Sequence, residues 1–442
     1  MPTSVDLLPE DVLREIFTYS VASESQMKYS RPRDILVLTH VCSRWRQIAL
    51  SMPYLWSTIH VSQCIPNVQF MHEWLSRAAA VPKTLFLKLA QERKEKDDLE
   101  PIHPIFASYP FQKLFVFPDY LHTDEDEDED ETMFVLPNQL LEHLEELHLN
   151  ESRAMFPHDA KLPNLQRLSI ASDWEPGNFQ RYSPAIPWSQ IRHLTLSRPN
   201  VETHLLFSVL KQCVRLEYCK IKYPRDHHRA PTPFHNITLP NLLSLELSTF
   251  DHSWAHIFGA ECMRRLIIPS VNVLQLSLWN LDTSVYSRVI EHSGGMPRLH
   301  TLTLREHTAD IGILLKLLPH LESLTVSRDL GTRIWQDLSM GRLGPRLKHI
   351  TSPVSAVDVV LDLLKIRYQN AMRSSTRQQH DGGVCQPQIT HFQSATFVLS
   401  CDRSKFQVMV RHALDSNGRG PYQCLQWTFD GISDRTYTLD DI

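Results

Sequence analysis

The middle of this chain repeats one short pattern, L-x-x-L-x-L, at nearly regular steps. The successive starts lie 21, 26, 25, 26, 31, 26, 22 and 26 residues apart, mostly within the range of about 20 to 29 residues that is typical of stacked, strand-containing units. The second and third apolar residues alternate along a short strand and point to one side, and the first closes the preceding turn. Because one unit cannot bury a core alone, the pattern predicts an α/β solenoid of stacked units. The nine copies begin at Leu144, Leu165, Ile191, Leu216, Leu242, Val273, Leu299, Leu321 and, in a weaker form, Leu347.

Two earlier copies begin at Pro82 and Phe111, and an acidic run separates them from the main series. The run DEDEDEDE, Asp124–Glu131, lies in a gap of 33 residues that would be 25 without it. We interpret it as a loop inserted into one unit of a repeat domain that spans residues 82–352. Two roles stay open for it: a solvated loop that repels itself, which is the simpler interpretation, or a docking arm for a basic partner.

The segments between the strands have a helical period. HLLFSVLKQC and IGILLKLL place apolar residues three and four apart, which indicates helices returning between strands. The units resemble irregular leucine-rich repeats, and this resemblance implies a horseshoe-shaped solenoid. Regular repeats of this family carry an asparagine after the strand, and only Asn150 fits that position here, so we expect uneven curvature.

The N-terminus predicts a small helical module over residues 5–60. In LLPEDVLREIF, Pro9 suits a first helical turn, and an apolar stripe follows at helical spacing. Asp34 is a candidate N-cap for a second helix of about four turns, from Ile35 to Ala49. So few short helices expose more apolar surface than they can cover among themselves. Either the rest of the chain covers it, or another protein does.

The order of these segments resembles the F-box, in which a Leu-Pro start and a helix ending in Ile-Phe precede a Val-Cys-x-x-Trp motif. In that family the module docks on the Skp adaptor of cullin-RING ubiquitin ligases. The loop between the two motifs is longer than in the compact F-box, as it often is in fungal F-box-like proteins. The resemblance implies that Leu8, Pro9, Val12, Ile16 and Phe17 offer a surface to the adaptor, while Val41, Cys42 and Trp45 hold the helices together. With Leu13, which also fits the pattern, the implied adaptor-binding set is Leu8, Pro9, Val12, Leu13, Ile16, Phe17, Val41, Cys42 and Trp45.

The remaining segments complete the expected organisation. Residues 61–81 read as a connecting helix or linker, and residues 353–442 as an αβ cap that shields the last unit. Within the cap we expect a helix over 356–368, a mobile loop over 373–383, and the strands ATFVLS and LQWTF on either side of a helix around Phe406–Leu414.

No stretch of the sequence indicates a catalytic or cofactor site. With 13 glycines the chain lacks a glycine-rich phosphate loop, and neither G-x-S-x-G nor H-E-x-x-H occurs. His252, His256 and Cys262 lack a fourth zinc ligand at a suitable spacing. We therefore expect no enzyme, no cofactor and no metal.

Charge and cysteine content exclude further classes of partner. The net charge of -5 gives no reason to expect nucleic acid or an anionic membrane. The eight cysteines are scattered, as in proteins of a reducing compartment, and we see neither a signal peptide nor a membrane span. These features predict a cytoplasmic or nuclear location.

The outward residues of the predicted strands are the candidates for binding a target protein. Trp279 beside Arg305 has the character of a binding hot spot, although Trp279 could equally pack on its own unit. The outward positions are Glu146, His148, His193, Tyr218, Lys220, Lys222, Glu246, Gln275, Trp279 and Arg305, of which Tyr218, Lys220, Glu246, Trp279 and Arg305 are the tentative target-binding set.

Two functions follow as hypotheses. The first is a substrate-recognition subunit of a Skp-cullin-F-box ubiquitin ligase, which binds the adaptor through its N-terminal module and an unknown target through its repeats. The second is a ligase-independent scaffold, in which the helices of residues 5–60 cap the first repeat.

Overall fold

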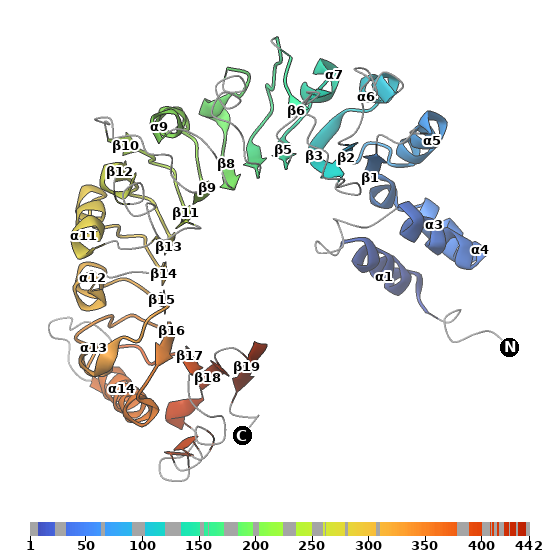
Figure 1. The fold of residues 1–442 in the computed structure, drawn as a ribbon. Helices are drawn as coiled ribbons and strands as arrows, with labels where there is room; N and C mark the ends of the chain where they lie inside the picture. The colour runs from blue at the N-terminus through green and yellow to red at the C-terminus, as the bar shows by residue number, and fades with distance from the viewer. Residues whose placement is uncertain are drawn as a thin grey trace, which may run out of the picture. The chain divides into compact units, whose positions relative to one another are not determined.

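The fold was analysed in a computed structural model of residues 1–442 (Figure 1). Two compact units divide the chain: Met1–Thr195 with Pro199–Val201, and Leu196–Arg198 with Glu202–Ile442. The structure describes residues 8–22, 32–62, 67–90, 102–119, 134–150, 154–157, 159–171, 184–197, 203–223, 236–249, 260, 262–278, 282–305, 310–377, 389–399, 407, 409–410, 413–414, 420–423, 425–429 and 432–438.

The first unit joins a helical module to a parallel sheet. The module contains α1 (Glu10–Ala22), α3 (Pro32–Val41), α4 (Ser43–Leu50) and the 3-10 helix η2 (Pro53–Trp56). The sheet has the order β1-β2-β3-β5-β7-β8. Its strands are β1 (Thr58–Ser62), β2 (Lys83–Ala90), β3 (Phe111–Asp119), β5 (Glu146–Leu149), β7 (Arg167–Ile170) and β8 (His193–Ser197), the last of which is divided between the units. The connections contain α5 (Val68–Arg77), α6 (His103–Ser108), α7 (Asn138–Leu141), η4 (Trp188–Gln190) and the small pair β4 (Phe134–Val135) and β6 (Ala154–Met155).

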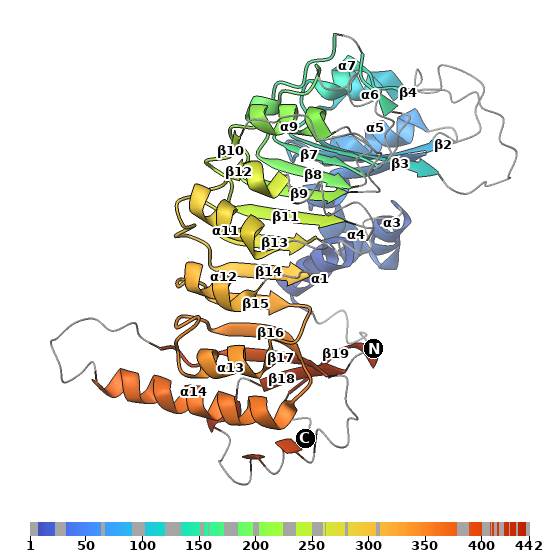
Figure 2. The ribbon, with the colours of Figure 1, turned by 60° about the vertical axis from the view of Figure 1, so that its left-hand side comes forward.

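The second unit is a parallel sheet with helices on one side (Figures 1 and 2). Its strand order is β9-β11-β13-β14-β15-β16-β17-β18-β19, and only β19 runs antiparallel to its neighbour. Neither sheet closes into a barrel among the described strands. The strands are β9 (Tyr218–Tyr223), β11 (Ser244–Thr249), β13 (Val273–Ser277), β14 (Thr301–Arg305), β15 (Ser323–Val326), β16 (His349–Val354), β17 (Ser394–Leu399), β18 (Leu425–Phe429) and β19 (Ile432–Thr438). The connecting elements are α9 (Thr203–Gln212), α11 (Thr283–His292), α12 (Ile311–Leu317), α13 (Gly331–Ser339), α14 (Val357–Arg377), η5 (Gly420–Tyr422) and the small pair β10 (Ile237–Thr238) and β12 (Leu266–Ile267).

Each copy of L-x-x-L-x-L coincides with a strand, and its apolar residues are buried except Pro82, which is exposed, and Val273, which is half-buried. Along β13, β14 and β15, buried side chains alternate with half-exposed or exposed ones. The register corrects one copy: Leu245 pairs with Leu274 and Leu247 with Leu276. The first residue of that copy is therefore the fully buried Val271, not Val273. The neighbouring steps then become 29 and 28 residues instead of 31 and 26.

The same buried spacing continues beyond the copies that the sequence predicts. Trp56, Ile59 and Val61 lead into and along β1, so the connecting region after the helical module already contains a strand. The expected boundary between residues 352 and 353 falls inside β16, and β17 and β18 continue the parallel order. Two further sets of buried residues occupy the pattern positions there: Phe392, Ala395 and Phe397, and Tyr422, Leu425 and Trp427.

Two helices differ from the sequence prediction. The single helix expected from Ile35 to Ala49 is two helices, α3 and α4, and α3 begins at Pro32, so Asp34 lies inside it instead of at its N-cap. The helix expected over 356–368 extends to Arg377, and it includes the first part of the predicted loop. The rest of that loop, 378–383, lies outside the described residues, as does the acidic run 124–131.

A buried arginine joins α14 to the rest of the second unit. The Arg367 side chain is fully buried, and its guanidinium lies 4.3 Å from the Phe392 ring centroid. Burial lowers the pKa of Arg367 to about 9, so the group stays charged at neutral pH. Its N–H groups donate to the backbone carbonyls of Leu338, Gly344, Leu347 and Thr390 at 2.5, 2.9, 3.0 and 3.0 Å.

Candidate functional site

The N-terminal helices share a small core. The Leu13 and Phe17 side chains are fully buried, and the Phe17 ring meets the Trp45 ring edge-on at 5.0 Å. The expectation that Phe17 is part of the outer surface is therefore wrong. Phe17 and Leu13 lie one helical turn apart on α1 and join it to α3 and α4.

The Val-Cys-x-x-Trp motif has a local structural cause. Cys42 is extended and is the N-cap of α4, because its Sγ accepts a hydrogen bond from the Trp45 backbone N–H at 3.5 Å. The chain therefore changes direction at Cys42, and Arg46 secures the turn by donating to the Thr39 carbonyl at 2.8 Å. Cys42 and Trp45 thus join the helices, as the resemblance implies.

The outer sides of α1 and α3 carry exposed apolar side chains. Val12, Ile16 and Tyr19 recur at helical spacing on α1 and are 39%, 42% and 71% exposed, and Val37 and Val41 on α3 are 59% and 53% exposed. Val41 was expected to hold the helices together, but it lies at the surface. We call these five residues the apolar rows.

The Leu-Pro pair marks the start of α1. Pro9 is exposed, and its carbonyl accepts the first helical hydrogen bond from the Leu13 N–H at 3.2 Å. Leu8 is half-buried, and Arg44 donates to its carbonyl at 2.6 Å. Both residues therefore lie beside the apolar rows at the beginning of α1.

A tryptophan connects the helical module to the sheet within the first unit. The Trp56 side chain is fully buried, and its indole N–H donates to the Ala49 carbonyl at 2.9 Å. Its ring meets Trp74 of α5 edge-on at 4.8 Å, and the Arg77 guanidinium lies 4.7 Å from it. Trp74 in turn donates to the Thr58 carbonyl of β1 at 3.0 Å. These contacts tie α4, α5 and β1 together.

Four aromatic rings stack in a row on the sheet of the first unit. His60, Phe86, Phe115 and His148 lie side by side on β1, β2, β3 and β5, and we call them the ring ladder. Their centroids are 4.5, 4.5 and 4.2 Å apart, and their planes lie within 10° of parallel. The spacing follows from the distance between paired strands, about 4.8 Å. Sequence analysis selected only His148 of the four, because Phe86 and Phe115 read as ordinary strand residues.

A carboxylate next to the ladder is held by cations. Glu146 Oε1 lies 2.7 Å from His148 Nε2, and Glu146 Oε2 lies 3.0 Å from Lys113 Nζ and 3.6 Å from Arg167 Nη1. The hydrogen bond with His148 lowers the pKa of Glu146 to about 2, and Lys113 adds to the effect against partial burial. Glu146 is therefore ionised and already paired at neutral pH.

His60 makes the stability of this unit depend on pH. Burial, with the nearby Lys88 ammonium, lowers the pKa of His60 from 6.5 to about 4. Because the unfolded chain binds this proton first, the free energy of unfolding decreases as pH falls from 6.5 to 4, by about 2 kcal/mol at pH 4.5. His60→Phe keeps a ring in the ladder and should remove that part of the loss. Urea unfolding at pH 7 and 4.5 measures it, with the exposed His320→Gln as the control; an unchanged pH dependence in His60→Phe would contradict the assignment.

The predicted target-binding residues form part of the open strand face in the second unit. Lys220 and Glu246 are register partners on β9 and β11, and their charged groups are 2.6 Å apart. Tyr218 is half-buried on β9, and burial raises the pKa of its hydroxyl. Arg305 is exposed at the end of β14, in register with Ser277 and not with Glu246. Trp279 lies outside the described residues, so the expected Trp279 and Arg305 pair stays a prediction.

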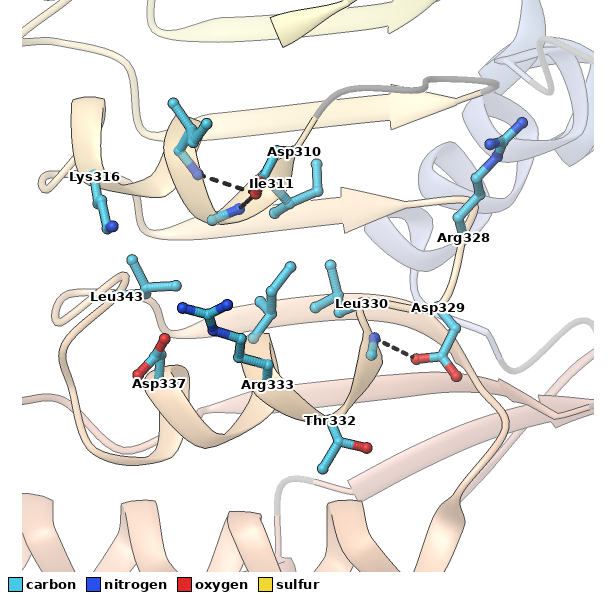
Figure 3. Close-up of a pocket in the computed structure, with 14 residues that line it drawn as sticks. Asp310, Ile311, Lys316, Arg328, Asp329, Leu330, Thr332, Arg333, Asp337 and Leu343 are labelled. Atoms are coloured by element: carbon cyan, nitrogen blue, oxygen red, sulfur yellow. Dashed lines mark hydrogen bonds between the residues drawn. The ribbon is translucent and has the colours of Figure 1, made fainter.

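A groove between α12 and α13 carries charges of both signs (Figure 3). It encloses about 560 Å³. Its acidic side chains already accept hydrogen bonds from backbone N–H groups or pair with an arginine. Asp310 accepts from the Gly312 N–H at 2.8 Å, Asp329 from the Gly331 N–H at 3.0 Å, and Asp337 pairs with Arg342 at 3.4 Å. These carboxylates therefore start and brace the two helices.

The described residues contain no cluster of three or more histidine, cysteine or acidic side chains that could hold a metal ion. Cys262 is buried and forms no disulfide, whereas His252 and His256 lie outside the described residues. Among the described helices, none combines the length and the apolar character needed to cross a membrane.

Comparison with known protein families gives a match for the helical module. An F-box-like family model matches residues 5–62, which include α1, α3, α4, η2 and β1. No curated protein matches the chain. The N-terminal region is thus an F-box-like domain, a kind of domain that typically binds Skp-type adaptors.

Proposed function

We propose, on the premise that residues 5–62 form an F-box-like domain, that this protein is the substrate-recognition subunit of a Skp-cullin-F-box type ubiquitin ligase. The apolar rows carry the proposal, because these five side chains are exposed on adjoining helices of the matched domain. An adaptor that covers them would take apolar surface out of water.

The energy available is sufficient for a stable subunit contact. Burying an aliphatic side chain contributes about 1.5 to 3 kcal/mol before the entropy cost of association is subtracted. Val12, Ile16, Val37 and Val41 could each contribute part of that range, because each is already about two-fifths or more exposed in the free chain. Leu13 and Phe17 would support the surface from beneath.

The parallel sheet has the second role in this proposal. We interpret its strands as leucine-rich repeats whose open face binds a target protein, and the subunit itself performs no chemistry. It would raise the effective concentration of the target near the ligase by binding two proteins at once. A cullin scaffold is reached through the adaptor, in the cytoplasm or the nucleus.

Substitution of the α1 row tests adaptor binding. Val12→Asp with Ile16→Asp should lower recovery of a Skp-type adaptor by more than tenfold, because two carboxylates would have to be buried at the contact. Val135→Asp with Leu243→Asp, also exposed apolar positions, is the matched control and should leave recovery unchanged. Equal recovery by both double variants, at equal unfolding midpoints, would refute the proposal.

The scaffold alternative has an observation in its favour. Leu55 and Trp56 are fully buried where the helical module meets the sheet, as expected if the module caps the first strand. A cap alone predicts no adaptor binding by the wild-type chain. The adaptor pull-down therefore separates the two functions.

A further inference from the structure

We infer that the ring ladder and its flanking cations bind an acidic peptide segment that also carries an aromatic or aliphatic side chain. The inference deepens the proposed function, on which it rests for the identity of that peptide as part of a target protein. It moves the target site from the residues selected on β9, β11 and β14 to the sheet of the first unit.

The face that carries the ladder is open to an incoming chain. The leucines of β2 and β3 are buried, and Figure 1 draws α5, α6 and α7 along one side of these strands. Phe115, Phe117 and His148 are each partly exposed, and Phe117 extends the ladder along β3 at 6.3 Å from Phe115. An extended peptide would therefore find partly exposed rings on β1, β3 and β5, whereas Phe86 on β2 is 4% exposed and supports its two neighbours.

The arrangement of the rings favours negative charge. Each inner ring covers its neighbour's face, so the edges of the rings point away from the sheet. Aromatic faces carry partial negative charge and edges partial positive charge. A row of outward edges is consequently complementary to carboxylates and to apolar side chains alike.

Cations outnumber anions among the described charged side chains on this face. The charged outward side chains described on β2, β3, β5 and β7 are Lys88, Lys113, Glu146 and Arg167, three cations and one anion. Glu146 is held by Lys113 and Arg167, whereas Lys88 forms no ion pair among the described residues. The whole chain carries a net charge of -5, so this excess of positive charge is local.

The geometry favours a peptide over single-stranded nucleic acid. Bases bind proteins by stacking on free aromatic faces. In the ladder, both faces of Phe86 and Phe115 are already occupied by neighbouring rings at 4.2 to 4.5 Å. Carboxylates need only ring edges and cations, and Phe115, His148, Lys113 and Arg167 are each partly exposed.

Selection from a random heptapeptide phage library on the full-length chain tests the inference. We expect the enriched peptides to contain at least two acidic residues and one aromatic or aliphatic residue. The best of them, made synthetically, should bind Lys88→Glu at least tenfold more weakly and Lys211→Glu, the same charge reversal on α9, within twofold of wild type. Phe115→Thr, checked for an unchanged unfolding midpoint, should also lose at least tenfold.

Each contrary outcome has a defined meaning. Absence of enrichment, enrichment without acidic residues, or equal binding by Lys88→Glu would overturn the inference, as would equally tight binding of a labelled oligouridine. Acidic peptides enriched only by a chain that lacks residues 124–131 would assign the face to the chain's own acidic run instead. Adaptor recovery is measured on the same preparations, so that failure of the proposed function is seen separately from failure of this site.

Discussion

Arg367→Met should lower the free energy of unfolding of the second unit by about 3 to 5 kcal/mol, because it removes four hydrogen bonds that a buried cation donates to backbone carbonyls. The guanidinium donates to carbonyls at the end of α13, in the following turn and before β17. Leu338 and Gly344 precede α14 in the sequence and Thr390 follows it, so one side chain binds acceptors from both sides of the helix. Methionine fills much of the volume but supplies no hydrogen bond.

The measurement is chemical unfolding followed by circular dichroism. Gln369→Met is the matched control, since it places the same side chain on the exposed side of the same helix and should change the midpoint little. Arg367→Lys should lie between the two, because an ammonium has three donors and cannot span all the carbonyls. A midpoint for Arg367→Met equal to that of Gln369→Met would show that the carbonyls find other donors.

Trp56→Ala should destabilise the first unit by about 3 to 5 kcal/mol, the usual cost of removing a fully buried large aromatic side chain. The loss has two parts: the cavity left beside Trp74, and the Ala49 carbonyl that no longer receives the indole N–H. The Trp74 contact joins η2 to α5, and the Ala49 hydrogen bond joins η2 to α4, so the module should lose its attachment before the sheet unfolds.

Limited proteolysis and urea unfolding together test this expectation. Trp56→Phe retains a ring against Trp74 and loses only the hydrogen bond and some volume, so it should cost about 1 to 2 kcal/mol. We expect cleavage of Trp56→Ala first between the module and β2. Cleavage and a midpoint like those of wild type would mean that the module is held by other contacts.

The repeat pattern predicted much of the strand order, because leucine at fixed spacing reports burial on one side of a strand. It failed where other residues fill the same positions. Trp56, Ile59 and Val61 take them in β1, and Phe392, Ala395 and Phe397 take them in β17. Aromatic residues and alanine fit the core there, and a search for leucine overlooks them. The two-residue error at Val273 has a related cause, because Val271 and Val273 both satisfy the pattern and only the register separates them.

The helical module shows a different limit of sequence reasoning. Periodicity placed Leu13, Ile16 and Phe17 on one apolar stripe, yet the structure buries Leu13 and Phe17 and leaves Ile16 42% exposed. Which residues of this stripe are buried depends on where α4 packs against α1. Cys42 determines the position of α4, because α3 ends before it and it caps α4. The ring ladder could not be predicted from the sequence either. Its neighbouring rings are 26 to 33 residues apart, and only the register of the paired strands brings them together.

The strand β1 belongs both to the matched F-box-like segment, which ends at residue 62, and to the sheet, where Thr58 to Ser62 pair with β2. No free tether therefore separates the two parts of the first unit. A protein bound on the ladder would therefore be held in a fixed orientation relative to any partner of the N-terminal helices. In the proposed ligase, this rigid connection, and not a flexible linker, would determine which lysines of the bound protein a ubiquitin-carrying enzyme can reach.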